Sequence, residues 1–213
     1  MFRSFKSALK SILLILCLML PMPQLSAAPG ILVTGDSLSA AYGIPLEEGW
    51  VALLQKRLKD EGYPHRVVNT SVSGETTAGG LGRLDKELQQ HQPALVIIEL
   101  GANDGLRGLP MADMKQNLAS MINKSRKSGA QVLLLGMRLP SNYGQAYTEQ
   151  FRQVFQQVAK EHSVALVPFF LADIALDRSQ FLNDGIHPNA AAQPALLNSI
   201  WPKLKPMLEK PAP

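Results

Sequence analysis

Residues 31–38 read Ile-Leu-Val-Thr-Gly-Asp-Ser-Leu, a short apolar run that ends in Gly35, Asp36 and Ser37. A run of this length, bounded by turn-forming residues, predicts a buried β-strand. Four comparable runs follow along the chain: Arg66–Asn69, Ala94–Glu99, Gln131–Leu135 and Ala165–Val167. Five short apolar strands favour a parallel sheet that is covered on both faces.

The stretches between these strands have helical periodicity. Apolar residues recur three or four positions apart in three groups: Val51, Leu54 and Leu58; Met114, Leu118, Met121 and Ile122; Phe151, Phe155 and Val158. Pro110 and Gly129 suit the start and the end of the helix between them. A last helix is expected over Ala190–Leu208, although Pro202 and Pro206 interrupt it. The alternation predicts an α/β fold of three layers, α/β/α and flavodoxin-like, with a five-stranded parallel sheet.

The N-terminal segment has the features of a secretory signal peptide. Three basic residues precede an apolar run over Ile12–Leu20, and small residues follow it. The run is shorter than the about 20 residues that a membrane span needs. We therefore expect export to the periplasm or the exterior of a bacterium, with cleavage after Ala27 or Ala28. Cleavage after Ala27 is preferred, and the mature chain, 28–213, is expected to form one domain without stable membrane insertion.

Charge and cysteine content exclude several classes of protein. Loss of residues 1–27 removes Arg3, Lys6 and Lys10 and lowers the formal net charge from +4 to +1. Without a basic cluster, we expect no nucleic-acid partner. The single cysteine, Cys17, lies in the signal segment, and no cluster of His, Cys, Asp and Glu has metal-ligand spacing. We expect no metal and no cofactor.

Polar residues follow the first three predicted strands, at the sheet edge where α/β proteins bind ligands. Ser37 follows the first strand, in a turn tight enough to need Gly35; alternatively, Asp36 or Ser37 caps a helix. Gly74, after the second strand, can bring a backbone N–H close to a substrate oxygen. Asn103, after the third, offers an amide donor. Ordinary turns would use the same residue types, so each signal is weak alone.

The stretch Asp184-Gly185-Ile186-His187-Pro188 places an acid three residues before a histidine. A carboxylate that accepts from Nδ1–H fixes the ring tautomer and leaves Nε2 as a base. The other histidines, His65, His91 and His162, lie beside polar residues and are expected at the surface. His187 is therefore the candidate base for Ser37.

In order and context, Ser37, Gly74, Asn103 and His187 resemble the four sequence blocks of the GDSL, or SGNH, hydrolases. The similarity extends to Arg138–Gly144 and to Pro168-Phe169-Phe170. It implies the SGNH hydrolase fold and a serine hydrolase of acyl esters and thioesters. Arylesterase, acyl-CoA thioesterase and lysophospholipase activities on small molecules would follow from it.

The resemblance also implies roles for individual residues. Ser37 would be the nucleophile, with His187 as its base and Asp184 as the acid that orients the ring. The oxyanion hole would consist of the Ser37 N–H, the Gly74 N–H and the Asn103 amide. Substrate would be bound by residues of two segments: Thr76, Thr77, Ala78, Gly79 and Gly80, and Leu106, Arg107 and Leu109. We expect the glycine-rich segment to close over an acyl chain, unless it is a plain connection to the next helix.

Three alternatives compete with this interpretation. A carbohydrate O-acetylesterase would share the four blocks and differ in its acyl group. A catalytically silent binding module would share the fold, but it would lack a triad residue, and none is missing. A receiver domain that accepts phosphate on an acid at a strand end does not fit an exported chain. We expect a monomer.

Overall fold

The computed structural model describes residues 28–208 of the chain, so the predicted signal peptide lies outside the described residues. The elements in this range follow in this order: β1 (Gly30–Gly35), η2 (Leu46–Glu48), α2 (Trp50–Asp60), β2 (Arg66–Asn69), α3 (Thr77–His91), β3 (Leu95–Glu99), α4 (Ala102–Leu106), α5 (Met111–Lys127), β4 (Gln131–Leu135), η3 (Ser141–Tyr143), α6 (Gln145–Glu161), β5 (Ala165–Val167), η4 (Arg178–Gln180), η5 (Ala190–Ala192), α7 (Gln193–Leu204) and η6 (Lys205–Met207).

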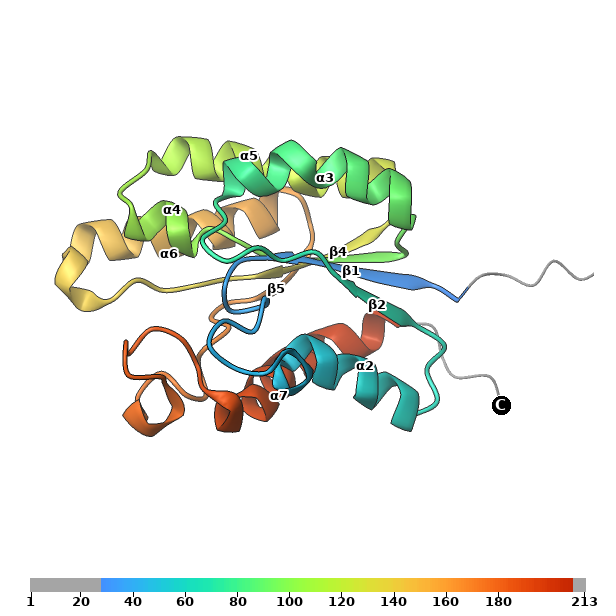
Figure 1. Ribbon diagram of the computed structural model, residues 1–213. Coiled ribbons are helices and arrows are strands. Elements are labelled where there is room, and N and C mark those ends of the chain that lie inside the picture. Colours follow the sequence, from blue (N-terminus) through green and yellow to red (C-terminus); the bar gives the residue numbers. More distant parts are fainter. Residues whose placement is uncertain (1–27, 209–213) are drawn as a thin grey trace, which may run out of the picture.

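The five strands form one parallel sheet in the order β2-β1-β3-β4-β5 (Figure 1). This is the flavodoxin-like order, and it confirms the predicted fold class. The predicted strand bounds differ from the observed ones by one residue at most: β1, predicted over Ile31–Thr34, is one residue longer at each end, and β3, predicted from Ala94, begins at Leu95. The strand ends that carry Ser37 and Asn103 meet at one edge because β1 and β3 are neighbours.

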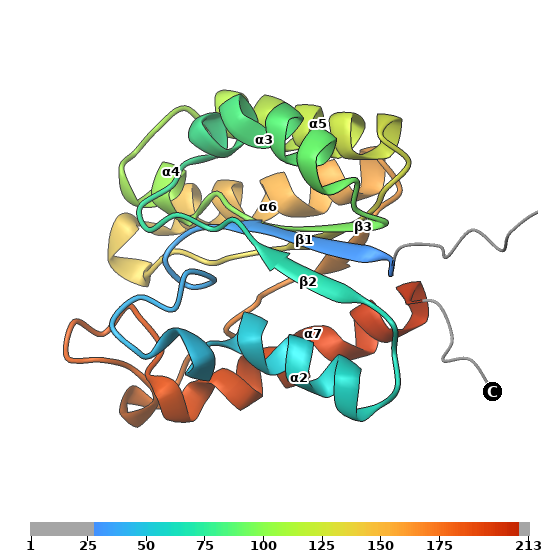
Figure 2. The ribbon, with the colours of Figure 1, turned by 45° about the vertical axis from the view of Figure 1, so that its right-hand side comes forward.

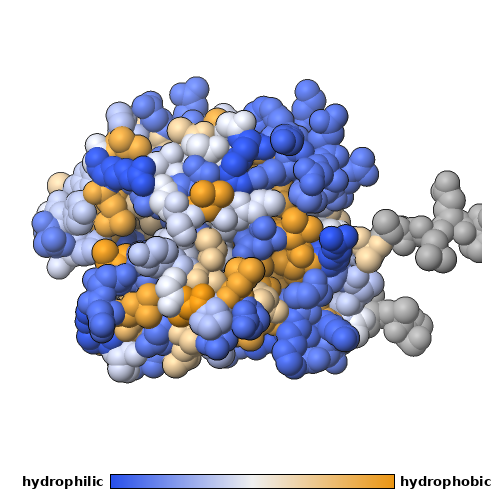
Figure 3. Space-filling view, viewed as in Figure 1, coloured by the Kyte–Doolittle hydropathy of each residue, from blue (hydrophilic) through white to orange (hydrophobic). Residues whose placement is uncertain are grey.

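Helices cover both faces of the sheet. Figures 1 and 2 show α3, α4, α5 and α6 on one face and α2 and α7 on the other, which gives the three layers expected. All five residues of β3 are buried, as are the three predicted helical stripes. On the face seen in Figure 3, hydrophobic residues gather in the middle, between the hydrophilic outer surfaces of the helices.

Proline and glycine set several helix ends. Pro110 is the N-cap of α5, and Gly129, with a φ of 91°, follows its C-terminal end. The single helix expected at the C-terminal end is divided into η5, α7 and η6. Pro202 lies in the last turn of α7 and Pro206 within η6, where a residue without an N–H removes a helical hydrogen bond.

His65 corrects one expectation. It is buried, with 4% of its surface exposed, and its ring centroid lies 6.2 Å from that of Tyr63. Its polar sequence neighbours suggest a surface position.

Within residues 28–208, no helix is both long and apolar enough to cross a membrane.

Candidate active site

The chain leaves β1 through a series of turns rather than a helix. Residues 37–43 form turns, so no helix follows that Asp36 or Ser37 could cap, and that alternative is wrong. Asp36 Oδ1 accepts a hydrogen bond from the Leu38 N–H at 3.1 Å within this turn. Gly35 does not have a left-handed φ, so the backbone angle of the turn does not require glycine, in contrast to the prediction. A Cβ at this position would lie 2.8 Å from both Glu99 Oε2 and Ser39 Oγ. Glycine is therefore required here by the close approach of two side chains.

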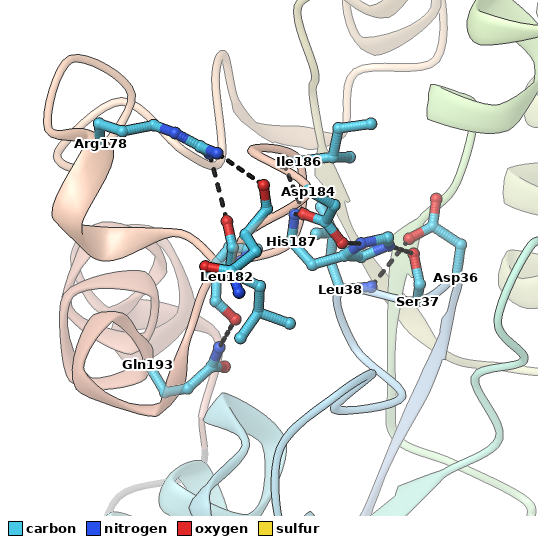
Figure 4. A network of polar contacts seen from close by, with 11 residues as sticks. Asp36, Ser37, Leu38, Arg178, Leu182, Asp184, Ile186, His187 and Gln193 are labelled. Atoms are coloured by element: carbon cyan, nitrogen blue, oxygen red, sulfur yellow. Dashed lines mark hydrogen bonds and ion pairs between the residues drawn. The ribbon is translucent and has the colours of Figure 1, made fainter.

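Ser37, His187 and Asp184 form a continuous chain of hydrogen bonds (Figure 4). Ser37 Oγ lies 2.9 Å from His187 Nε2, and His187 Nδ1 lies 2.8 Å from Asp184 Oδ2. Ser37 and His187 are partly buried, and the Asp184 side chain is 38% exposed. This arrangement can pass the Ser37 hydroxyl proton to His187 while Asp184 holds the Nδ1–H tautomer.

The backbone holds Asp184 in its ionised form. Asp184 Oδ1 accepts the N–H groups of His187 at 3.0 Å and Ile186 at 2.8 Å. These hydrogen bonds, that of His187 first, lower the pKa of Asp184 to about 2. The carboxylate is therefore charged at every pH at which the protein is expected to work.

Contacts from two sides fix the loop that carries Asp184 and His187. The Arg178 guanidinium donates to the carbonyls of Leu182 at 3.2 Å and Asn183 at 2.8 Å (Figure 4). The Leu182 N–H donates to the His187 carbonyl at 2.8 Å, which closes the loop on itself. The position of His187 is thus set by the fold and not only by Asp184.

The expected oxyanion donors follow three strands of the sheet: Ser37 follows β1, Gly74 follows β2 and Asn103 follows β3. Gly74 has a φ of 79°, and its carbonyl accepts from Arg107 Nη2 at 2.7 Å. Asn103, in α4, donates one N–H of its amide to Asp36 Oδ2 at 3.1 Å, which leaves the second N–H for another acceptor. Within the described range, neither the Ser37 N–H nor the Gly74 N–H donates to another residue.

The segment expected to bind the acyl chain is in part a helical turn. Thr76 is the N-cap of α3, and residues 77–80 are its first turn. Thr77 is buried because its N–H and hydroxyl donate to Asp104 at 2.9 and 2.5 Å. Gly80 is buried against Leu100, so neither Thr77 nor Gly80 presents a surface to a substrate. Thr76 and Leu106 are partly exposed, and Ala78, Gly79, Arg107 and Leu109 are exposed.

Sequence patterns missed Tyr42. Its ring centroid lies 4.4 Å from that of His187, although half of its surface is exposed. Ala41 is buried with a φ of 56°, a left-handed conformation that is uncommon for alanine, and its neighbour Tyr42 turns over the histidine. The Tyr42 N–H donates to the Ser37 carbonyl at 3.1 Å, which ties this turn to Ser37.

Sequence patterns also missed a buried carboxyl pair behind Ser37, formed by Asp36 and Glu99. Glu99 is fully buried and Asp36 is 1% exposed. Burial raises the pKa of Asp36 to about 6, against the opposing effect of the Leu38 N–H. Burial and the charge of Asp36 raise the pKa of Glu99 well above its usual range.

Among residues 28–208, no group of three or more His, Cys, Asp or Glu could hold a metal ion.

The chain is similar to known proteins in sequence and in fold. The model of the GDSL-like lipase/acylhydrolase family matches residues 33–194. The chain is 55% identical to the esterase TesA of Pseudomonas aeruginosa over 201 residues, which are 94% of this chain and all of that protein. It is 40% identical to thioesterase 1/protease 1/lysophospholipase L1 of Escherichia coli K12 over 86% of both chains. A crystal structure of TesA superposes with a TM-score of 0.83 at 57% identity, over 84% of this chain and 99% of that one.

Proposed function

This chain belongs to the GDSL-like lipase/acylhydrolase family and is an ester and thioester hydrolase; on that premise we propose that Ser37, His187 and Asp184 form its catalytic triad. The observation that carries the proposal is the continuous hydrogen-bonded chain from Ser37 Oγ through His187 to Asp184. A hydroxyl at the carboxyl end of a strand, with a base and an acid in line, supports nucleophilic catalysis.

The reaction would proceed through an acyl-enzyme. His187 Nε2 takes the Ser37 proton while Oγ attacks the carbonyl carbon, and Asp184 stabilises the imidazolium. The tetrahedral intermediate expels the alcohol or thiol, which takes the proton from His187. Water then repeats the sequence at the acyl-enzyme and releases the carboxylic acid, which returns Ser37 to its starting state.

The developing oxyanion needs donors that are already in place. The N–H groups of Ser37 and Gly74 and the second N–H of Asn103 fit this role, because each follows a strand at the same edge of the parallel sheet and donates to no other described residue. Loss of one such donor typically costs about 3 to 4 kcal/mol of transition-state stabilisation. Because a thiol, with a pKa near 8.5, leaves with less proton assistance than an alkoxide, one site can hydrolyse both esters and thioesters.

Ser37→Ala and His187→Ala test the triad directly. Each variant is expected to lose about three or more orders of magnitude in kcat on p-nitrophenyl butyrate, since triad residues act as a unit. Ser141→Ala and His162→Ala are matched controls that remove an exposed serine and a partly exposed histidine outside the site. Circular dichroism checks the fold. A folded Ser37→Ala variant with turnover near that of the parent would reject the triad.

Exposed apolar side chains favour fatty acyl substrates. Tyr42 and Ile186 are each 50% exposed beside His187, and Val72, at 48%, lies two residues before Gly74. Leu109, at 37%, follows α4. If an acyl chain lies on these residues, each methylene removed from water contributes up to about 0.8 kcal/mol. The expected substrates are acyl esters, acyl thioesters and lysophospholipids.

A chain-length series distinguishes this substrate class from the carbohydrate O-acetylesterase. The values of kcat/KM for p-nitrophenyl acetate, butyrate, octanoate and palmitate are measured below their micelle-forming concentrations. Fatty acyl specificity predicts a rise from acetyl to medium or long chains. A maximum at acetyl would reject it and favour the O-acetylesterase.

The same proposal covers export and organisation. We expect residues 1–27 to be removed as a signal peptide and residues 28–213 to act as one periplasmic or secreted domain. We also expect a monomer with no nucleic-acid partner and no cofactor. The N-terminal sequence of the exported protein and its mass by light scattering test these expectations.

A further inference from the structure

Gly35 and Glu99 are register partners on the neighbouring strands β1 and β3. Gly35 lacks a side chain, and the Glu99 carboxyl fills the space above it. A Cβ on Gly35 would lie 2.8 Å from Glu99 Oε2, a separation that real contacts do not show. The glycine that opens the nucleophile turn is thus fitted to the glutamate across the sheet. Residue 99 is fully buried, and nothing in the proposed triad chemistry uses it.

The Glu99 carboxyl contacts the backbone and side chains around Ser37. Glu99 Oε2 accepts the Asp36 N–H at 3.3 Å and the Ser39 hydroxyl at 2.8 Å. Asp36 directly precedes Ser37, and Ser39 lies two residues after it. Asp36 in turn holds the Asn103 amide at 3.1 Å. One carboxyl therefore connects the nucleophile turn to a proposed oxyanion donor.

The surroundings of Glu99 favour its neutral form. In the described part of the chain, no ion pair includes Glu99, and the charge that acts on it is that of the Asp36 carboxyl. A buried charge next to a like charge is costly, and a proton removes that cost. The neutral acid can accept at Oε2 and carry its proton on Oε1, which has no hydrogen-bond partner among the described residues.

We infer that Glu99 is a positioning residue for ester hydrolysis, which holds the Asp36–Ser39 turn and, through Asp36, the Asn103 amide; the inference rests on the proposed roles of Ser37 and Asn103. It does not touch the substrate. Its effect is expected on kcat rather than on KM, because it fixes groups that act at the transition state.

Glu99→Ala and Glu99→Gln test this inference as a pair. Glutamine keeps an oxygen for the Asp36 N–H and the Ser39 hydroxyl, and its N–H₂ replaces Oε1, which has no hydrogen-bond partner among the described residues. Glu99→Gln is expected to stay within about threefold of the parent kcat, whereas Glu99→Ala falls about 10- to 100-fold with KM almost unchanged. Active sites are counted by the burst of p-nitrophenol, so unfolded protein does not lower the measured kcat.

A second pair of variants keeps the test valid if Glu99→Ala does not fold. Ser39→Ala and Ser125→Ala each remove one buried hydroxyl, and the Ser125 hydroxyl donates within α5, to the Met121 carbonyl at 2.9 Å. Ser39→Ala is expected to lower kcat per active site about three- to tenfold, while Ser125→Ala leaves it at the parent value.

The outcomes separate this inference from the proposed triad. The role of Glu99 would be overturned if Glu99→Ala kept the parent kcat per active site. If Glu99→Ala does not fold, the parent kcat in Ser39→Ala would overturn it. An inactive Ser37→Ala variant beside either result would leave the triad intact. Equal losses in Glu99→Gln and Glu99→Ala would overturn the role of Glu99 as well, because glutamine should restore the contacts. An active Ser37→Ala variant would instead reject the triad itself.

Discussion

Two aspartates flank the Ser37–His187 pair, and their environments are opposite. Asp184 is 38% exposed, and three hydrogen-bond donors lower its pKa to about 2, with the His187 N–H as the largest effect. Asp36 is 1% exposed, and burial raises its pKa to about 6. The same side chain is thus a permanent anion on one side of the site and a titrating group on the other.

The difference shows how local structure assigns two uses to one residue type. Backbone N–H groups make Asp184 a strong, fixed anion that can stabilise a developing imidazolium. Asp36 has two neutral donors, the Leu38 N–H and the Asn103 amide, but no cation bonded to it in the described residues. Asp36 is therefore suited to orienting the Asn103 amide and the turn that contains Leu38. If the comparison holds, substitution of the two residues should have unequal effects.

The largest expected difference is kinetic. Asp184→Asn is expected to lower kcat about 10³- to 10⁴-fold, because an amide does not hold the Nδ1–H tautomer of His187. Asp36→Asn is expected to cost only about tenfold, since it removes one acceptor from the Asn103 amide. Steady-state kinetics on p-nitrophenyl butyrate, with burst-counted active sites, measures both. Losses of equal size would break the comparison.

A smaller difference is expected in the stability of the fold. Because folding raises the pKa of Asp36, its ionised form destabilises the native state. This cost is absent below about pH 3.8 and complete above pH 6, where a shift of this size corresponds to roughly 3 kcal/mol. The stability of Asp36→Asn relative to the parent should therefore improve by about this amount between pH 3.5 and pH 7. Urea unfolding at both pH values measures it, and a constant difference would contradict the buried anion.

The smallest effect is expected in the contribution of Asp184 to the stability of the fold. Folding lowers its pKa, so the charge stabilises the native state above pH 3.8, and this contribution is lost as the pH falls toward 2. The group is more than one third exposed, and solvent screening reduces the contribution to about 1 kcal/mol or less. Asp184→Asn should be less stable than the parent by this amount at pH 7 and equally stable near pH 2. A variant that is more stable at pH 7 would reverse the sign of the comparison.

The fold could be predicted from sequence because its signals are local. Apolar runs bounded by Gly, Pro, Asn and Asp give the five strands nearly to the residue, and the helical stripes have a clear period. The four polar blocks lie at the ends of strands or in the last loop, so their convergence follows from parallel topology. Ser37, His187 and Asp184 do form the hydrogen-bonded chain that was expected.

Features that depend on contacts between segments could not be predicted. Residues 77–80 look like a flexible loop, but the Asp104 carboxylate fixes Thr77 in a helical turn. Glu99 looks like the polar end of an apolar strand until the β1–β3 register puts it over Gly35. Tyr42 reaches His187 only through the left-handed Ala41. Each of these needs a partner far away in sequence or an unusual backbone angle.

Covalent labelling of the nucleophile tests the central claim most directly. The exported protein is treated with a fluorophosphonate, which reacts with activated serines, and the modified residue is located by peptide mass spectrometry. The triad predicts one phosphonyl group per molecule, on Ser37, with loss of esterase activity in proportion to labelling and no labelling of His187→Ala at the same rate. Complete loss of activity with the group on another residue, or full activity with Ser37 labelled, would contradict it.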